Sequence, residues 1–443
     1  MSDKIVDQTE TIVAPASGAG AAAIAVIRIS GPKTSAVVEA LAGRLPAPRR
    51  AALRDIGKPT IDRGLVLWFP APGSFTGEDM AELQVHGSRA VVQAIVEAVL
   101  AVGGTALAEP GAFARRAFEN GKLDLTEVEG LADLINAETE AQRRQALAQS
   151  QGSLRRLYEG WRAELLKAQA LMEAGLDFAD EADVALDVGV KANAIVAPLL
   201  QSIESHLADR SGERLRDGLR VVIAGPPNAG KSSLLNALAK RDAAIVSEEA
   251  GTTRDVIEVH LDLAGLPVIL ADTAGVREGR GAVESEGIRR ALTRAEESDV
   301  VLWVIDATDP VWEPPASLAS KSFVQAVNKA DICPQSADNN AIPNALVLSA
   351  KTGAGLDRLI ARLEEIASAE IGSTAQAPIT RTRHRAELVS CRDALKRFVN
   401  HDLSAELEAE ELRIAAVHLG RLTGVIDVEE VLGAIFAEFC IGK

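Results

Sequence analysis

Apolar and polar positions follow different rhythms in different parts of this chain of 443 residues. In residues 1–120, glycine and proline separate short β-rich runs such as 23–29 and 64–69, and residues 88–102 have helical spacing. Short strands mixed with a helix are typical of a compact α+β domain. We therefore expect a first, α+β domain over residues 1–120.

A helical rhythm begins at about residue 121. Leu154, Leu157, Trp161 and Leu165 recur every three or four positions, and no proline occurs between residues 111 and 197. Helical patterning returns over residues 385–437, after a linker at 372–378. Neither helical segment has enough partners alone, so we expect residues 121–217 and 372–443 to pack as one α-helical bundle.

Residues 218–371, between the two helical segments, alternate apolar runs with polar loops. The runs 219–224, 266–271, 324–327 and 346–348 predict buried strands, and residues 232–240 predict a helix after the first strand. This alternation predicts an α/β domain inserted into the helical bundle. The expected fold is multidomain.

The loop after the first of these strands is a phosphate-binding motif. Gly225-Pro226-Pro227-Asn228-Ala229-Gly230-Lys231-Ser232 fits the pattern G-x-x-x-x-G-K-[ST], whose backbone N–H groups and helix N-terminus face phosphates. Lys231 is expected to reach the β- and γ-phosphates of GTP, and the Ser232 hydroxyl to ligate Mg²⁺. The nucleotide contacts expected from this segment are Asn228, Ala229, Gly230, Lys231, Ser232 and Ser233.

Two further stretches are typical of nucleotide-sensing loops. In Gly251-Thr252-Thr253-Arg254-Asp255, Thr253 is expected to close on Mg²⁺ when triphosphate is bound. In Asp272-Thr273-Ala274-Gly275, Asp272 is expected to hold the Mg²⁺ shell through water, and the Gly275 N–H to sense the γ-phosphate. Either stretch alone could be an ordinary loop.

The last two stretches select the base. Asn328-Lys329-Ala330-Asp331 and Ser349-Ala350-Lys351 each follow a predicted strand. The Asp331 carboxylate can accept two N–H bonds from guanine, whereas adenine offers no such pair of donors, so a buried carboxylate would discriminate strongly. Because all five stretches occur in order, the sequence predicts a guanine-nucleotide pocket, and the inserted domain is expected to be a Ras-like α/β P-loop GTPase domain.

The residue that orients the attacking water is not obvious from the motifs. Ras-like proteins carry glutamine directly after Asp-x-x-Gly, but this chain has Val276, which cannot hydrogen-bond water. The charged stretch 277–290 offers Glu278, Glu284 and Glu286, any of which could instead be a solvated loop charge. No arginine finger can be assigned by spacing, although Asn228 could help to ligate a monovalent cation beside the phosphates.

Composition narrows the function classes. The net charge of −16 argues against broad, non-specific nucleic-acid binding and against DNA, so an RNA substrate would need a local basic patch or a partner protein. No apolar run reaches the length of a membrane span, and residues 1–10 lack a signal-peptide core, so we expect a cytoplasmic protein. The three cysteines, Cys333, Cys391 and Cys440, fit no zinc spacing or disulfide framework.

Four other stretches, together with Gly251-Thr252-Thr253-Arg254-Asp255, carry a family resemblance. They are Arg28-Ile29-Ser30-Gly31, Ser74-Phe75-Thr76-Gly77-Glu78-Asp79, Asn120-Gly121-Lys122-Leu123-Asp124-Leu125 and the ending Cys440-Ile441-Gly442-Lys443. Nearly end to end, the chain resembles the MnmE (TrmE) family of bacterial tRNA modification GTPases. The resemblance implies GTP hydrolysis as part of a tRNA-modifying complex. With an FAD-dependent, MnmG-like partner, such proteins add a (carboxymethyl)aminomethyl group to the wobble uridine of certain tRNAs.

The resemblance also implies a tetrahydrofolate derivative as one-carbon donor and a constitutive homodimer, which joins its partner as a heterotetramer. Residues 1–120 would be the folate-binding and dimerisation domain, with folate contacts at Arg28, Glu82, Lys122 and Lys443. Each of these four residues could instead be an ordinary surface charge. Cys440 is a candidate nucleophile or proton carrier, or equally a small buried residue.

In this family K⁺ replaces the arginine finger. By position, Asn228, Ser247, Glu249 (through its backbone) and Thr252 would surround the K⁺ ion. The family's water-orienting glutamate falls on Glu284, and Arg277 would hold the switch segment. With Lys231 and Asp272, these two residues form the expected catalytic set.

One different class of function fits the same five nucleotide motifs. A regulatory GTPase, such as a switch in ribosome assembly, needs no covalent chemistry. Such proteins lack an N-terminal folate-like domain and a Cys-Ile-Gly-Lys ending, which favours the enzyme.

Overall fold

The computed structural model describes residues 10–18, 20–177, 182–241, 243–245, 258–272, 298–314, 322–333, 345–372, 378–400 and 403–426, with 432, 433, 435, 436, 439 and 442. The chain forms two compact units. The first comprises Met1–Ala132 with Val417–Lys443, and the second is Asp133–Ala416. In the described part of the chain, no helix is both long and apolar enough to cross a bilayer.

The first unit is built on a six-stranded mixed sheet in the order β3-β4-β5-β2-β1-β6. All strand pairs are antiparallel except β1 with β6. The strands are β1 (Thr11–Pro15), β2 (Ala22–Ser30), β3 (Ala52–Ile56), β4 (Asp62–Phe69), β5 (Met80–Gly87) and β6 (Thr105–Leu107). The α+β expectation for this region is thus confirmed, and the runs 23–29 and 64–69 lie within β2 and β4.

Helices α1 (Thr34–Ala42) and α2 (Arg89–Leu100) cover one face of this sheet. Val37, Val38, Ile95 and Val99 from the helices join Ile27, Ile29 and Leu83 from the strands in one buried core. Ser88 caps α2, because its hydroxyl accepts the N–H of Val91 at 3.2 Å. Two further helices, α3 (Ala112–Glu119) and α4 (Leu125–Asn136), follow β6, and the division between the units falls inside α4.

A second six-stranded sheet lies in the second unit, in the order β12-β11-β10-β7-β9-β8, with only β8 antiparallel. Its strands are β7 (Leu219–Ala224), β8 (Glu258–Leu263), β9 (Leu266–Asp272), β10 (Val300–Asp306), β11 (Ser322–Asn328) and β12 (Leu346–Val347). Helices α9 (Lys231–Leu238) and α11 (Leu356–Ile371) share one core cluster with the sheet. All four strands predicted here are confirmed, and the helix after β7 begins one residue earlier than expected.

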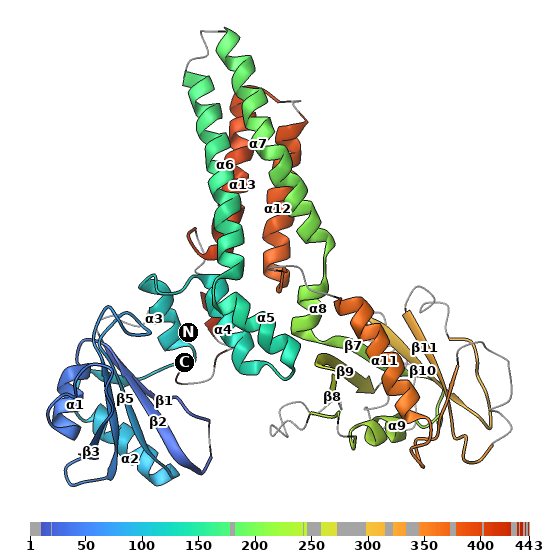
Figure 1. The fold of residues 1–443 in the computed structure, drawn as a ribbon, viewed down its shortest axis with the longest axis horizontal. Coiled ribbons are helices and arrows are strands. Elements are labelled where there is room, and N and C mark those ends of the chain that lie inside the picture. The colour runs from blue at the N-terminus through green and yellow to red at the C-terminus, as the bar shows by residue number, and fades with distance from the viewer. Residues whose placement is uncertain are drawn as a thin grey trace, which may run out of the picture. The chain divides into compact units, whose positions relative to one another are not determined.

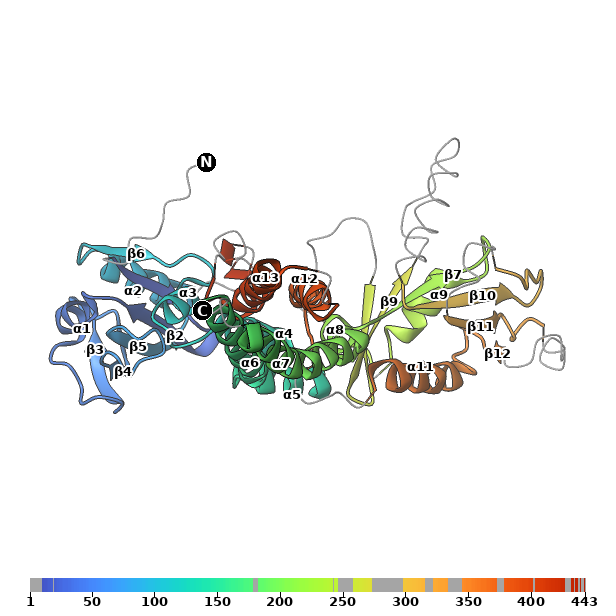
Figure 2. The ribbon, with the colours of Figure 1, turned by 90° about the horizontal axis from the view of Figure 1, so that it is seen from above.

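The remaining helices of this unit are mostly long, although α8 has only seven residues. They are α5 (Glu140–Ser150), α6 (Ser153–Asp177), α7 (Ala182–Ala208), α8 (Ser211–Asp217), α12 (Thr382–Val399) and α13 (Ala405–Thr423), of which the unit includes the first part of α13. Figures 1 and 2 show α6, α7, α12 and α13 side by side. The His384 ring of α12 meets Tyr158 of α6 edge-on at 5.8 Å, and Arg397 of α12 pairs with Glu411 of α13 at 2.7 Å. Helices from before and after the second sheet therefore pack together.

Candidate functional site

The loop between β7 and α9 has a backbone that only small residues permit. Gly225 has φ +147°, and a Cβ there would lie 2.3 Å from the carbonyl oxygen of Val304. Gly230 has φ +92°, and a Cβ there would lie 2.3 Å from Nδ2 of Asn328. Asn228 also adopts a left-handed φ of 63°. These constraints bend residues 225–230 into a turn directly before the N-terminus of α9, which is the geometry that phosphate binding requires.

Lys231 closes over this turn. Its ammonium donates to the carbonyl oxygens of Gly225 at 3.0 Å and Pro226 at 2.9 Å. The loop thus holds the positive charge that we expect to reach the β- and γ-phosphates.

Ser232 and Asp272 bring oxygen atoms from two elements together. The Ser232 hydroxyl, at the start of α9, donates to Oδ2 of Asp272, at the end of β9, over 2.6 Å. Asp272 is only 2% exposed. A hydroxyl and a buried carboxylate in contact are the hard oxygen ligands that Mg²⁺ prefers, so this donor set fits the expected ion.

Asn328 joins the phosphate loop to the base-selecting loops. Its Nδ2 donates to the carbonyl oxygen of Ala229 at 2.9 Å, and its Oδ1 accepts the N–H of Ala350 at 2.9 Å. Asp331 lies beside this bridge, where its Oδ1 accepts the hydroxyl of Ser349 at 2.7 Å. The amide of Asn328 therefore fixes the relative position of the three loops, and Ser349 orients the carboxylate expected to recognise guanine.

Asp306, at the end of β10, is a site residue that sequence reasoning missed. Its Oδ2 lies 2.6 Å from Nζ of Lys329, and its Oδ1 accepts the N–H and the hydroxyl of Thr308. Burial opposes ionisation of Asp306, but the bonds from Lys329 and Thr308 outweigh it and hold its pKa below the usual value. The signal was available, because Asp306 ends an apolar run as Asp272 does.

Part of the expected nucleotide and folate machinery lies outside the described residues. These positions are Ser247, Glu249, Gly251, Thr252, Thr253, Thr273, Ala274, Gly275, Arg277, Glu284, Cys440 and Lys443. Within the described ranges, no group of three or more His, Cys, Asp and Glu could hold a metal ion.

The first unit places two of the expected folate contacts together. Arg28 of β2 and Glu82 of β5 are register partners, and the guanidinium donates to Oε1 of Glu82 at 3.2 and 2.9 Å. The same guanidinium lies 5.5 Å from the ring centre of Phe75 and 5.7 Å from that of Phe113. Arg28 is thus an arginine between two aromatic rings with one acidic partner.

Two of the quoted sequence stretches meet next to this pair. The side-chain amide of Asn120 donates to the carbonyl oxygen of Thr76 at 2.8 Å, and a Cβ on Gly77 would lie 3.3 Å from Cγ of Lys122. Lys122 itself donates to the carbonyl oxygen of Pro72 at 2.9 Å. The segments 74–79 and 120–125 are therefore neighbours in space, and Lys122 belongs to their contact.

A buried ion pair in the same unit was not predicted. Arg116, only 4% exposed, donates to Glu78 at 2.8 Å and to the carbonyl oxygen of Ser30 at 3.1 Å. The Ser30 hydroxyl in turn donates to Glu78 at 2.9 Å. This network links α3 to β2 and to the loop before β5. It therefore holds in place the strands that carry the expected folate contacts.

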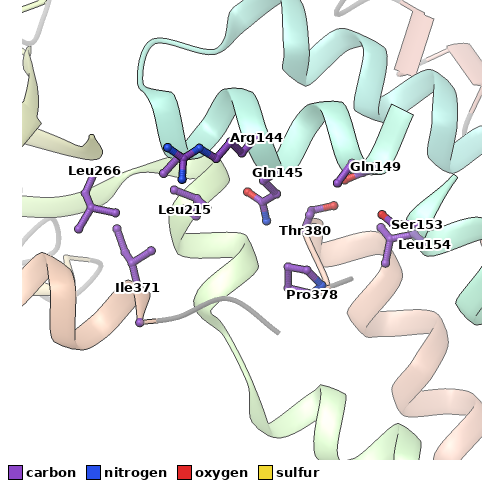
Figure 3. Close-up of a pocket in the computed structure, with 13 residues that line it drawn as sticks. Arg144, Gln145, Gln149, Ser153, Leu154, Leu215, Leu266, Ile371, Pro378 and Thr380 are labelled. Atoms are coloured by element: carbon purple, nitrogen blue, oxygen red, sulfur yellow. The ribbon is translucent and has the colours of Figure 1, made fainter. Parts of the chain in front are cut away.

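A cavity of about 280 Å³ lies in the second unit, where its sheet meets its helices (Figure 3). Gln145 and Gln149 of α5 face Thr380 across it, and Leu266 and Ile371 form its apolar end. Beside the cavity, the N–H of Ala141 donates to the carbonyl oxygen of Gly265, in the β8–β9 turn, at 3.2 Å. The β8–β9 hairpin, which ends at Asp272, is therefore docked on the start of α5.

The glycine-bent loop, the Ser232–Asp272 contact and the Asn328 bridge define a P-loop nucleotide-binding protein. Comparison with known proteins identifies its family. The model "GTP-binding protein TrmE N-terminus" matches residues 11–122, and "MnmE helical domain" matches residues 125–440. The chain belongs to the MnmE family of tRNA modification GTPases.

Relatives named tRNA modification GTPase MnmE match nearly the whole chain. The proteins of Parvibaculum lavamentivorans and Paramagnetospirillum magneticum are each 51% identical over 98% of this chain and 100% of their own length. That of Rhodopseudomonas palustris strain BisB5 is 49% identical over 98% of this chain and 99% of its own. A solved structure of Aquifex aeolicus Era bound to GDP and aluminium fluoride covers 40% of this chain and 66% of its own, at 26% identity and a TM-score of 0.27.

Proposed function

We propose that this protein is a K⁺-stimulated GTPase that modifies the wobble uridine of certain tRNAs together with an FAD-dependent partner. Membership of the family makes it a GTP hydrolase that acts in tRNA modification. The observation that carries the proposal is that the phosphate loop and the start of α9 contact both Asp272, through Ser232, and the amide of Asn328. The first would take part in magnesium and phosphate binding, and the second would hold the base-selecting loops against the phosphate loop.

The nucleotide pocket would work mainly by positioning. Backbone N–H groups of residues 228–233 and the Lys231 ammonium would bind the phosphates, and Asp331 would accept two N–H bonds from guanine. Bound Mg²⁺ would be held by Ser232 and Thr253, with Asp272 acting through water, and would offset charge on the phosphate oxygens. In the present structure Lys231 bonds to loop carbonyls, so nucleotide binding requires only that its ammonium turn toward the phosphates.

Hydrolysis needs two groups that the P-loop does not supply. Glu284 would orient the attacking water, because Val276 cannot, and Arg277 would hold the switch segment. A K⁺ ion held by Asn228, Ser247, Thr252 and the backbone of Glu249 would take the place of an arginine finger. Asn228 lies in the phosphate loop with a left-handed φ of 63°, three residues before Lys231.

The N-terminal unit would bind a tetrahydrofolate derivative and form the homodimer. Arg28 supports this proposal, because a cation between the Phe75 and Phe113 rings suits a ligand with a flat ring and a carboxylate. Glu82, Lys122 and Lys443 would complete the contacts. Residues 1–120 would form this domain, 218–371 the GTPase domain, and 121–217 with 372–443 the helical domain into which the GTPase is inserted.

The inserted arrangement suggests how nucleotide state reaches the tRNA chemistry. Strand β8 begins shortly after the switch segment 251–255, and His260 on it lies 2.7 Å from Glu138, just before α5. Together with the contact between Ala141 and Gly265, this pair makes the β8–β9 hairpin a connection from the switch to the helices. Movement of the hairpin would then be transmitted through the helices to the heterotetramer with the MnmG-like partner.

The proposed mechanism of hydrolysis is tested by two comparisons of the rate of GTP hydrolysis. GTP hydrolysis should be much faster in KCl than in NaCl at equal ionic strength, and Glu284→Ala should lower the KCl rate with GTP affinity nearly unchanged. Equal rates in both salts would contradict the potassium mechanism, and an unchanged rate in the variant would contradict the role of Glu284.

Formation of modified uridine in purified tRNA should require the partner, a folate donor and GTP. A reaction that proceeds equally with GDP would contradict coupling of GTP hydrolysis to the modification.

A further inference from the structure

The first unit contains a concentration of positive charge that the nucleotide and folate sites do not use. Between residues 44 and 58 the chain carries Arg44, Arg49, Arg50, Arg54 and Lys58, with Asp55 as the single acid. The whole chain, by contrast, has a net charge of −16. A local excess of basic side chains on an acidic protein is the kind of patch that an RNA substrate requires.

Three of these arginines line a hollow, which we call the arginine hollow. It has a volume of about 410 Å³ and is lined by Arg44, Leu45, Pro46, Ala47, Arg50, Ala52 and Arg54. No carboxylate lines it. Arg44 and Arg50 are exposed and Arg54 is half-buried, so their charges can reach a bound anion.

The arginines of the hollow differ from their neighbours in their partners. Elsewhere in this unit, Arg28 pairs with Glu82, Arg115 with Glu119 and Arg116 with Glu78. Arg44, Arg50 and Arg54 form no ion pair with any described residue. Within the described residues, the one hydrogen bond from these three side chains runs from Arg54 to the carbonyl oxygen of Leu53. Three guanidinium groups are thus left without a counter-charge.

The loop that presents the hollow is held in shape by Arg49. This residue adopts a left-handed φ of 59°, which is costly for a residue with a side chain. Its N–H donates to the carbonyl oxygen of Trp68 at 2.8 Å, its guanidinium bonds to the carbonyl oxygen of Gly73, and the same group lies 5.7 Å from the Phe69 ring centre. Arg49 anchors the loop to β4, and the neighbouring Arg44 and Arg50 are left to face outward.

A purely structural explanation accounts for only part of this arrangement. Arg54 lies on β3, an edge strand of the sheet, where a charge discourages pairing with other chains. That role does not explain Arg44 and Arg50, which lie in the loop before the strand. Guanidinium groups form paired hydrogen bonds with phosphate oxygens, so three of them around one hollow suit the closely spaced phosphates of a nucleic-acid backbone.

We propose that the arginine hollow binds the phosphate backbone of the tRNA substrate. The inference rests on the proposed tRNA function and gives the acidic chain its local RNA contact. Because phosphate contacts carry no sequence information, the hollow would position tRNA and leave the choice of uridine to other groups.

The test is tRNA binding by the full-length protein, measured by fluorescence anisotropy over a salt series. The variant Arg44→Gln/Arg50→Gln/Arg54→Gln is compared with Arg155→Gln/Arg362→Gln/Arg413→Gln, which removes the same charge from exposed arginines paired to acids on their own helices. The hollow variant should bind about tenfold or more weakly near 0.1 M salt, and its salt slope should fall by about 2 to 3. The control should keep the wild-type slope.

A lysine triple variant at the three hollow positions should keep the slope, because the charges remain. GTP hydrolysis without tRNA should be the same in all variants, which checks their folding. Equal tRNA binding by the hollow variant and the control would overturn the proposal while leaving the tRNA function intact. A changed oligomeric state of the hollow variant would overturn it too, since the hollow would then be a contact between copies. Absence of tRNA binding by the wild type, with unchanged wobble nucleosides in a strain lacking it, would instead remove the tRNA function.

Discussion

The nucleotide pocket and the Arg28–Glu82 pair are both polar sites at strand ends or on strands, yet they are organised differently. In the pocket, the Asn328 side chain bonds to the backbone of two neighbouring loops and so fixes their relative position. In the pair, Arg28 and Glu82 satisfy each other across two strands, as a purely structural ion pair would. The contacts in the nucleotide pocket therefore indicate a binding site even without a ligand. The Arg28–Glu82 pair becomes a binding site only if a ligand replaces Arg28 or Glu82 as the partner of the other.

The largest effect expected from this difference is at Asp272. Replacing it by asparagine removes the buried charge that contacts Ser232 and that we propose organises the magnesium shell. GTP hydrolysis should fall about 100-fold or more, by analogy with removal of a single group that stabilises transition-state charge. Steady-state phosphate release measures this loss, with Asp357→Asn, an 83% exposed side chain paired to Arg241, as control. A rate within twofold of wild type would place the magnesium site elsewhere.

A slightly smaller effect is expected at Asp331, where the change concerns specificity. In our proposal the Asp331 carboxylate accepts two bonds from guanine, whereas the amide in Asp331→Asn would donate one of them. GTP affinity should therefore fall about 100-fold, and xanthosine triphosphate should bind better than GTP. Calorimetric titration of both nucleotides measures the exchange. An unaltered preference for GTP would show that Ser349 orients Asp331 for a structural purpose only.

The Arg28–Glu82 pair should show a moderate effect that depends on ligand. Arg28→Ala leaves a carboxylate that is 18% exposed without its cation, so the unit should lose about 1–3 kcal/mol of stability. Arg63→Ala, from a pair that is about 70% exposed on both sides, should change stability by less than about 0.5 kcal/mol.

Folate binding decides whether this pair is more than structural. A reduced folate should raise the melting temperature of wild type and of Arg63→Ala, but not of Arg28→Ala, because a ligand stabilises only the state that it binds. If reduced folate protects Arg28→Ala as well as wild type, the pair is only structural.

Asp306 should give the smallest effect, with a defined pH dependence. Asp306→Asn removes the ion pair with Lys329 and should lower the free energy of unfolding by about 1–2 kcal/mol at neutral pH. Because the pKa of Asp306 is lowered in the folded protein, this stability is present above the unfolded pKa near 4 and is lost as pH falls through the folded pKa. Urea unfolding should therefore give a constant difference from pH 7 to 5 that shrinks in more acidic solution. A difference that already changes between pH 7 and 5 would point to another titrating group.

The sequence predicted four strands of the second sheet well, because each is a contiguous apolar run. Strand β7 has the bounds expected from its apolar run, and the phosphate loop follows it directly. Asp306 was missed although it ends an apolar run, because its ion pair is with Lys329, which follows a different strand, β11.

The first unit was harder to predict, because its contacts join residues far apart in sequence. The bond from Arg116 to Glu78 and the meeting of Asn120 with Thr76 depend on the strand order, which no local pattern specifies. The family resemblance pointed to Arg28 and Glu82, but only the register of β2 and β5 showed that they are partners. Arg44, Arg50 and Arg54 have no motif, and only the folded loop places them around one hollow.

The most direct test of the central claim is mass spectrometry of wobble nucleosides in total tRNA from a strain that lacks this protein. We predict that a modified uridine disappears, that the wild-type gene restores it, and that a gene encoding Asp272→Ala does not. An unchanged nucleoside profile in the deletion strain would contradict the account and favour a regulatory GTPase without covalent chemistry.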